Sequence, residues 1–95
     1  MRLYKLETGG KQGDLLIDLH AIQAVEDIVE EIGAGNTASL YFTILLTGKV
    51  FTARWDIIRD HDPKNPNNYD ALNSKIINIH QNLITAWKQY LDIGR

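Results

Sequence analysis

The basic residues between positions 40 and 59 are the strongest candidates for chemistry in this chain. Lys49 and Arg54 fall on one expected hairpin, Tyr41 is expected opposite Arg54, and Arg59 follows. An arginine beside an aromatic ring is a common way to hold a planar anionic ligand such as a nucleotide. The sequence therefore indicates Tyr41, Lys49, Arg54 and Arg59 as a candidate ligand-binding set. The competing interpretation of Arg54 and Tyr41 is an ordinary exposed cross-strand pair.

The three histidines carry no recognisable catalytic or metal-binding signature. His61 lies between two aspartates, but adjacent residues rarely converge on one ion, and no second pair of ligands has the spacing of a known site. His20 is expected at the surface, and His80 partly buried beside the apolar face of a helix. The chain has no cysteine, and neither Ser39 nor Ser74 sits in a G-x-S-x-G motif. We therefore expect no catalytic residue, no metal and no cofactor.

A β-hairpin over Leu40–Trp55 is the element that must position the basic residues. The segment reads LYFTILLTGKVFTARW, and its β-branched and aromatic residues favour a strand. Gly48 can take the positive φ of a tight turn, which places the turn at Thr47-Gly48. A two-residue loop then creates an apolar face with the pairs Ile44–Phe51, Phe42–Ala53 and Leu40–Trp55. The mixed face carries the pairs Tyr41–Arg54, Thr43–Thr52 and Leu45–Val50.

The segment Ala21–Ile32 is ambiguous between strand and helix. Its apolar residues at Ile22, Val25, Val29 and Ile32 fit helical spacing, and the following glycine suits a helix end. The same residues form a strand if the alternation is interrupted by a bulge, and we expect this strand. Two further strands are expected before it, over residues 1–7 and 14–19. The helical alternative would give the order β-β-α-β-β-α.

The C-terminal segment is the clearest helix, over residues 70–92. A stripe at i, i+3 and i+4 spacing should face the sheet, and it consists of Leu72, Ile76, Ile79, Leu83, Ala86, Trp87 and Tyr90. Ile77, Ile84 and Leu91 recur every seven residues beside this stripe. The two stripes together span close to half of the helix, which is more than one small sheet is expected to cover. The sequence therefore predicts Ile77, Ile84 and Leu91 as an oligomer interface.

These elements predict a single α+β domain over residues 1–95. It consists of a small antiparallel sheet of four or five strands in residues 1–59, a proline- and asparagine-rich linker over 60–69, and one C-terminal helix packed on one face of the sheet. The net charge of −2 and the pI near 5.8 make nucleic acid an unlikely partner. No apolar run approaches the roughly 18 residues of a membrane span, so we expect no membrane partner and a cytoplasmic location.

Three functions are compatible with this pattern. The first is a non-enzymatic, homo-oligomeric interaction or binding protein. The alternative is a small-ligand binder that sequesters an anionic nucleotide-like molecule; a short sheet followed by a C-terminal helix is similar to the plan of some phage proteins that sequester nucleotide signals. A small hydrolase is the third and least supported, because no constellation of catalytic residues is present.

Overall fold

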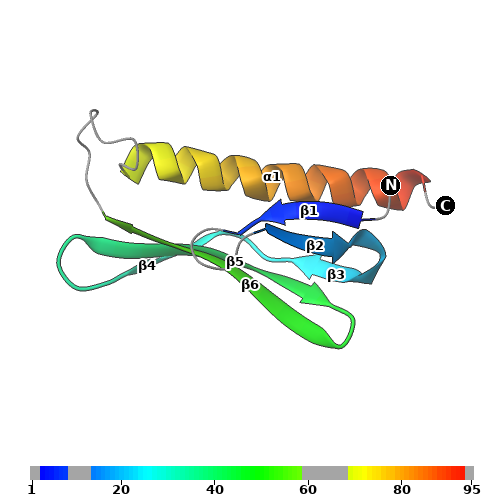
Figure 1. Ribbon diagram of the computed structural model, residues 1–95, viewed down its shortest axis with the longest axis horizontal. Helices are drawn as coiled ribbons and strands as arrows, with labels where there is room; N and C mark the ends of the chain where they lie inside the picture. The colour runs from blue at the N-terminus through cyan, green and yellow to red at the C-terminus, as the bar shows by residue number, and fades with distance from the viewer. Residues whose placement is uncertain (1–2, 9–13, 59–68, 94–95) are drawn as a thin grey trace.

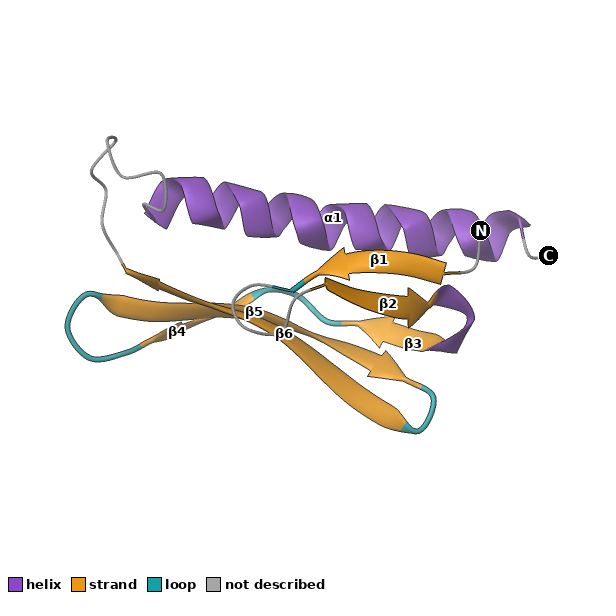
Figure 2. Cartoon of the chain, in the orientation of Figure 1, coloured by secondary structure: helices purple, strands orange, loops and turns teal. Residues whose placement is uncertain are grey.

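The computed structural model describes residues 3–8, 14–58 and 69–93, so most of the predicted linker 60–69 lies outside the described residues. The fold is α+β, as expected from the sequence (Figures 1 and 2). The N-terminal elements are β1 (Leu3–Glu7), β2 (Asp14–Asp18) and a short 3-10 turn, η2 (Leu19–Ala21). They are followed by β3 (Ile22–Val25), β4 (Val29–Ile32), β5 (Thr37–Leu46), β6 (Lys49–Ile58) and α1 (Tyr69–Ile93).

The β5–β6 hairpin has the predicted register over its whole length. Tyr41 pairs with Arg54, Phe42 with Ala53 and Leu40 with Trp55. Gly48 has a φ of 81°, which is the left-handed conformation that the turn requires. Alternate residues of β5 are buried along the strand, so one face of the hairpin belongs to the core.

Most of the segment Ala21–Ile32 lies in strands, which confirms the strand prediction over the helical one. It forms β3 and β4, and both pair with β5 in antiparallel fashion, β3 near the hairpin turn and β4 near the start of β5. The register shifts between Ile22 and Ala24, which is the expected bulge. Together β3 and β4 behave as one interrupted edge strand beside β5, with β6 on the other side.

The first two strands form a separate sheet, which the sequence did not predict. β1 pairs only with β2 among the described strands, in antiparallel register from Leu3–Asp18 to Glu7–Asp14. The Asp18 side chain then accepts the backbone N–H of His20 at 2.9 Å, which caps η2 and turns the chain toward β3. This turn separates the small sheet from the four-stranded one.

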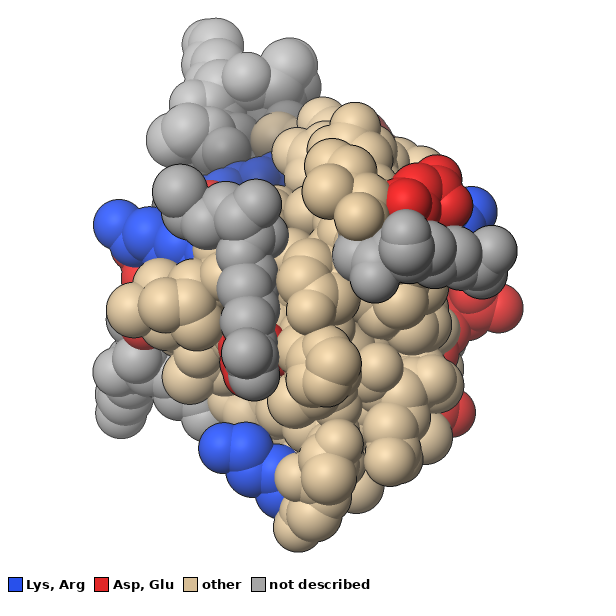
Figure 3. Space-filling view, turned by 90° about the vertical axis from the view of Figure 1, so that its right-hand side faces the viewer, with Lys and Arg blue, Asp and Glu red and all other residues tan. Residues whose placement is uncertain are grey.

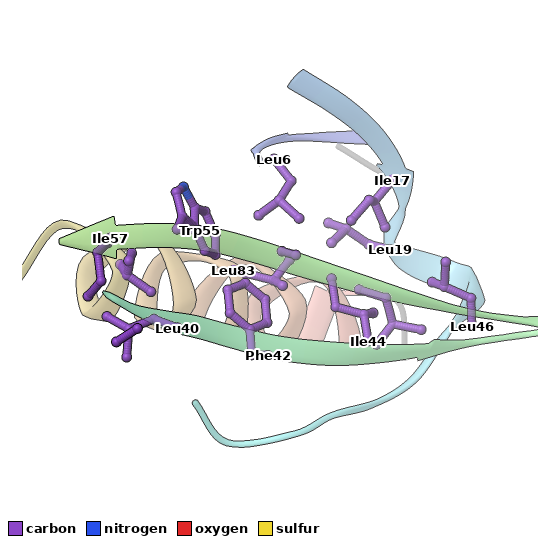
Figure 4. Close-up of a cluster of buried hydrophobic side chains, with 14 residues drawn as sticks. Leu6, Ile17, Leu19, Leu40, Phe42, Ile44, Leu46, Trp55, Ile57 and Leu83 are labelled. Atoms are coloured by element: carbon purple, nitrogen blue, oxygen red, sulfur yellow. The ribbon is translucent and has the colours of Figure 1, made fainter. Parts of the chain in front are cut away.

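The core lies between the hairpin and α1, where the predicted faces meet. Phe42 and Ile44 from β5, and Ile76 and Leu83 from α1, are completely buried. Figure 4 shows Leu6 and Ile17 of the small sheet pointing into the same cluster. From the predicted helix stripe, the side chains that pack partly buried against this core are Leu72, Ile79, Trp87 and Tyr90.

Replacing Leu83 by alanine should cost roughly 2–5 kcal/mol of the free energy of unfolding, because a fully buried side chain leaves a cavity. Chemical denaturation of the two proteins measures this difference. Gln81→Ala is the matched control, because Gln81 is exposed on the same helix and should change stability by no more than about 0.5 kcal/mol. A loss for Leu83→Ala as small as that of the control would show that α1 does not close the core.

Candidate functional site

Arg54 lies on the outer face of the hairpin in contact with one aromatic ring and two carboxylates. Its guanidinium carbon is 5.2 Å from the centre of the Tyr41 ring. Its Nη2 is 3.4 Å from Glu31 Oε2, and its Nε is 3.8 Å from Asp56 Oδ1. Asp56 Oδ1 also accepts a hydrogen bond from the Ser39 hydroxyl at 2.8 Å. The cation–π pair expected from the sequence is therefore present, with acidic partners that the sequence analysis had not paired with it.

These two carboxylates change what Arg54 can bind. An incoming anion would have to displace Glu31 and Asp56 or lie beside their negative charges. The Arg54 and Glu31 side chains are also solvent-exposed, so their attraction is modest. The geometry is that of an exposed cross-strand pair of Tyr41 and Arg54, to which β4 adds the carboxylate of Glu31, rather than that of an open anion site.

The structure does not bring the other two basic candidates to Arg54. Lys49 lies five residues away along β6, about 16 Å for an extended strand. Because alternate residues of a strand point to opposite faces, Lys49 and Arg54 also lie on opposite faces. Arg59 lies outside the described residues. Lys49 therefore does not form one site with Tyr41 and Arg54.

The two described histidines have structural partners. His80 Nε2 donates to the backbone carbonyl of Glu26 at 2.8 Å, and its ring meets Phe42 edge-on, with centroids 4.9 Å apart. This confirms the partly buried, hydrogen-bonded histidine expected on α1. His20 Nδ1 lies 2.9 Å from the Tyr90 hydroxyl, which joins η2 to the C-terminal part of the helix. His61 lies outside the described residues.

The remaining titratable groups form no evident reaction centre. Burial raises the pKa of the Tyr4 phenol, which stays neutral on the inner side of β1. No group of three or more metal-ligating side chains occurs in residues 3–8, 14–58 and 69–93. Among these residues, no helix combines the length and apolar content that a membrane crossing requires.

The predicted interface residues lie along one flank of α1, which we call the helix flank (Ile77, Ile84 and Leu91). Ile77 is 48% exposed and Leu91 is 42% exposed, while Ile84 between them is partly buried. In the neighbouring stripe Ile76 and Leu83 are fully buried, and the other members are partly buried. The described part of the chain therefore covers one of the two apolar stripes on this helix.

A further feature, which the sequence analysis missed, is an apolar cleft of about 340 Å³ between β2 and the tip of the β5–β6 hairpin. Its walls come from residues 15–18 of β2, Ala21, residues 46–47 and residues 49–51. Leu16 and Val50 border the cleft and are 67% and 63% exposed. The exposure of these two large apolar side chains beside one cleft is the feature that marks the site. It arises only because β2 lies near β6 in the fold, and no local sequence pattern indicates that proximity.

Replacing Arg54 by alanine should lower the free energy of unfolding by less than about 1 kcal/mol, because its ion pairs are exposed and screened. Chemical denaturation at low and high salt measures this loss, and the loss should shrink as salt rises. Lys88→Ala, on the exposed surface of α1, controls for the change in net charge. A salt-independent loss of several kcal/mol would contradict this description of the Arg54 cluster.

Comparison with protein-family models, with curated proteins and with solved structures finds no match to this chain. Proposals about its function therefore depend on the geometry of the residues described above.

Proposed function

We propose that the protein is a non-enzymatic, homo-oligomeric interaction protein whose copies meet through the helix flank. The observation that carries this proposal is the exposure of Ile77 and Leu91, at 48% and 42%, on a helix whose adjacent stripe packs against the core. Aligned apolar side chains on a surface are typical of partner contacts, whereas single ones are not.

The angular positions of the three residues suit a helix–helix contact. At about 100° per residue, Ile77, Ile84 and Leu91 lie about 100°, 80° and 60° around the axis from Ile76. The drift of about 20° per seven residues is the one that a left-handed pair of helices compensates by supercoiling. The spacing therefore fits an elongated contact with another helix better than a pocket for a small molecule.

A second copy of the chain is the simplest partner for this flank. In an antiparallel pair centred on Ile84, Ile77 of one copy meets Leu91 of the other, so the same patch serves both copies. The partly buried Asn73 and the exposed Gln81 border the flank and carry no charge, and the exposed Lys88 also lies beside it. No like-charge repulsion from these amides opposes the approach of two identical surfaces.

The flank lies on the side of α1 above β3 and β4. His80, on this side of the helix, bonds to the Glu26 carbonyl between β3 and β4, whereas Lys75, on the other side, pairs with Glu7 of β1 at 2.9 Å. Ile32 adds apolar area next to this side, because it is 63% exposed and pairs with Ala38, whose side chain points toward the helix layer.

The small size of the patch sets the expected strength. Stable specific interfaces bury at least about 1,000 Å² in total, and three helix residues per copy contribute only part of this area. We therefore expect self-association with a dissociation constant in roughly the micromolar range rather than the nanomolar range.

Replacing Ile84 by glutamate should convert the oligomer into a folded monomer, because it puts two like charges at the centre of the contact. Sedimentation velocity over a range of protein concentrations measures the size, and circular dichroism measures the fold. Ile77→Glu is a second variant at a more exposed position, and it should have the same effect with less risk to the intrachain core.

Gln89→Glu is the matched control, since Gln89 is exposed on the same helix about 140° around the axis from Ile84, and the added charge there should leave the oligomer intact. A wild-type chain that remains monomeric at high micromolar concentration would contradict the proposal. So would unfolding of both Ile84→Glu and Ile77→Glu, which would place the flank inside the intrachain core.

A second candidate function is the binding of an anionic, nucleotide-like ligand at Tyr41 and Arg54. The 5.2 Å cation–π contact between these residues supports it, because the same ring and guanidinium can stack on a base. Glu31 and Asp56 count against it, since they already neutralise the guanidinium. Weaker binding of a nucleotide by Arg54→Ala, measured by calorimetry without a change in thermal stability, would support this function over the oligomer.

A further inference from the structure

The cleft between β2 and the hairpin tip has the form of a small-molecule site. Its volume of about 340 Å³ lies within the range of ligand pockets, and its walls are mainly apolar, with a few polar groups. The half-buried side chains of Leu15 and Phe51 belong to its walls. If each non-hydrogen atom takes the ~30 Å³ of a water molecule in the liquid, the cleft has room for roughly eleven such atoms.

The cleft runs along the edges of two strands rather than across a face. Neighbouring residues of a strand point to opposite faces, yet four consecutive residues of β2 and three of β6 line this cleft. Among the described strands, β2 pairs only with β1 and β6 only with β5, so the edges at the cleft have no strand partner. Among the described residues, strand pairing therefore does not use the backbone N–H and C=O groups on these two edges.

The hairpin tip is held in place next to η2. The backbone N–H of Thr47 donates to the Ala21 carbonyl at 2.9 Å, and the Thr47 hydroxyl donates to the same oxygen at 3.3 Å. These bonds join two walls of the cleft, so its opening does not depend on an unsupported turn. Figure 3 views this end of the molecule, where charged side chains lie mainly toward the margins of an uncharged surface.

Lys49 gives the cleft its charge preference. It lines the cleft, and it forms no ion pair with any residue in the described ranges. Asp18 also lines the cleft, but its carboxylate accepts the backbone N–H of His20 at 2.9 Å. The Asp18 carboxylate keeps its negative charge, whereas the Lys49 ammonium has no ion-pair partner among the described residues and would attract an anionic group, for which a carboxylate is a natural choice.

We propose that this cleft binds a small amphiphile with an apolar chain of about eight carbons and a carboxylate head beside Lys49. The apolar walls take the chain, and the ammonium and the free strand edges take the oxygens. A peptide strand is a poorer fit, because strand addition depends on a row of main-chain bonds over several residues, which this volume does not admit. The proposal is independent of the oligomer, since the helix flank lies on the β3–β4 side of the molecule.

The test is calorimetric titration of the full chain with octanoate and with 1-octanol, which share the alkyl chain and differ in charge. Octanoate should bind saturably with one site per chain. Lys49→Gln should weaken the binding of octanoate by a factor of roughly ten or more, because a charged hydrogen bond is lost. It should weaken the binding of 1-octanol by less than about twofold. Val50→Trp should weaken the binding of both ligands, because the larger side chain fills the cleft from an exposed position. Lys88→Gln, on the surface of α1, is the matched control and should change neither.

Amide chemical shifts in the NMR spectrum locate the ligand, and octanoate should move those of residues 15–18 and 49–51. Absence of saturable octanoate binding, or equal affinity of the wild type and Lys49→Gln, would overturn the proposal. Saturable binding of an apolar hexapeptide that displaces octanoate would replace it with strand addition. Loss of self-association in Val50→Trp would make the cleft a contact between copies and would also overturn it.

Discussion

The packing of the hairpin's inner face against α1 is the interaction on which the rest of the structure depends. Phe42 and Ile44 on β5 and Ile76 and Leu83 on α1 are all completely buried. Because side chains alternate along a strand, a slip of one residue would turn this apolar set toward solvent, so the burial also fixes the register. The register in turn places Arg54 on the outer face, beside Tyr41 and the acidic residues of the neighbouring positions.

Local patterns were enough to predict the elements that make this contact. The period of two in β5, the glycine at the turn and the period of 3.6 in α1 each point to one structure, and all three are confirmed. The segment Ala21–Ile32 was harder, because it is short and its alternation is interrupted. Its pairing with β5 shows that it is extended, since β3, which contains a bulge, and β4, which follows residues 26–28, both form backbone hydrogen bonds with β5.

The sequence could not predict features that depend on contacts between distant segments. Glu31 reaches Arg54 only because β4 pairs beside β5, and the cleft exists only because β2 lies near β6. The position of Lys49 is different, since the alternation along β6 already placed it on the face opposite Arg54. Grouping Lys49 with Arg54 therefore overlooked a rule that the sequence itself supplied.

The width of the two layers explains why both candidate surfaces occur where they do. Three strands side by side, with β3 or β4 next to β5 and β6, span roughly 14 Å from edge to edge, whereas one helix is about 10 Å across. A single helix over β5 therefore leaves a margin of roughly 2 Å on each side. The small sheet continues the layer beyond β6 and leaves the cleft where the two sheets meet. Among the described residues no element fills the other margin, above β3 and β4, and there α1 presents Ile77 and Leu91 to solvent. The apolar area that one helix cannot cover is thus divided between the cleft on the β6 side and the exposed helix flank on the β3–β4 side.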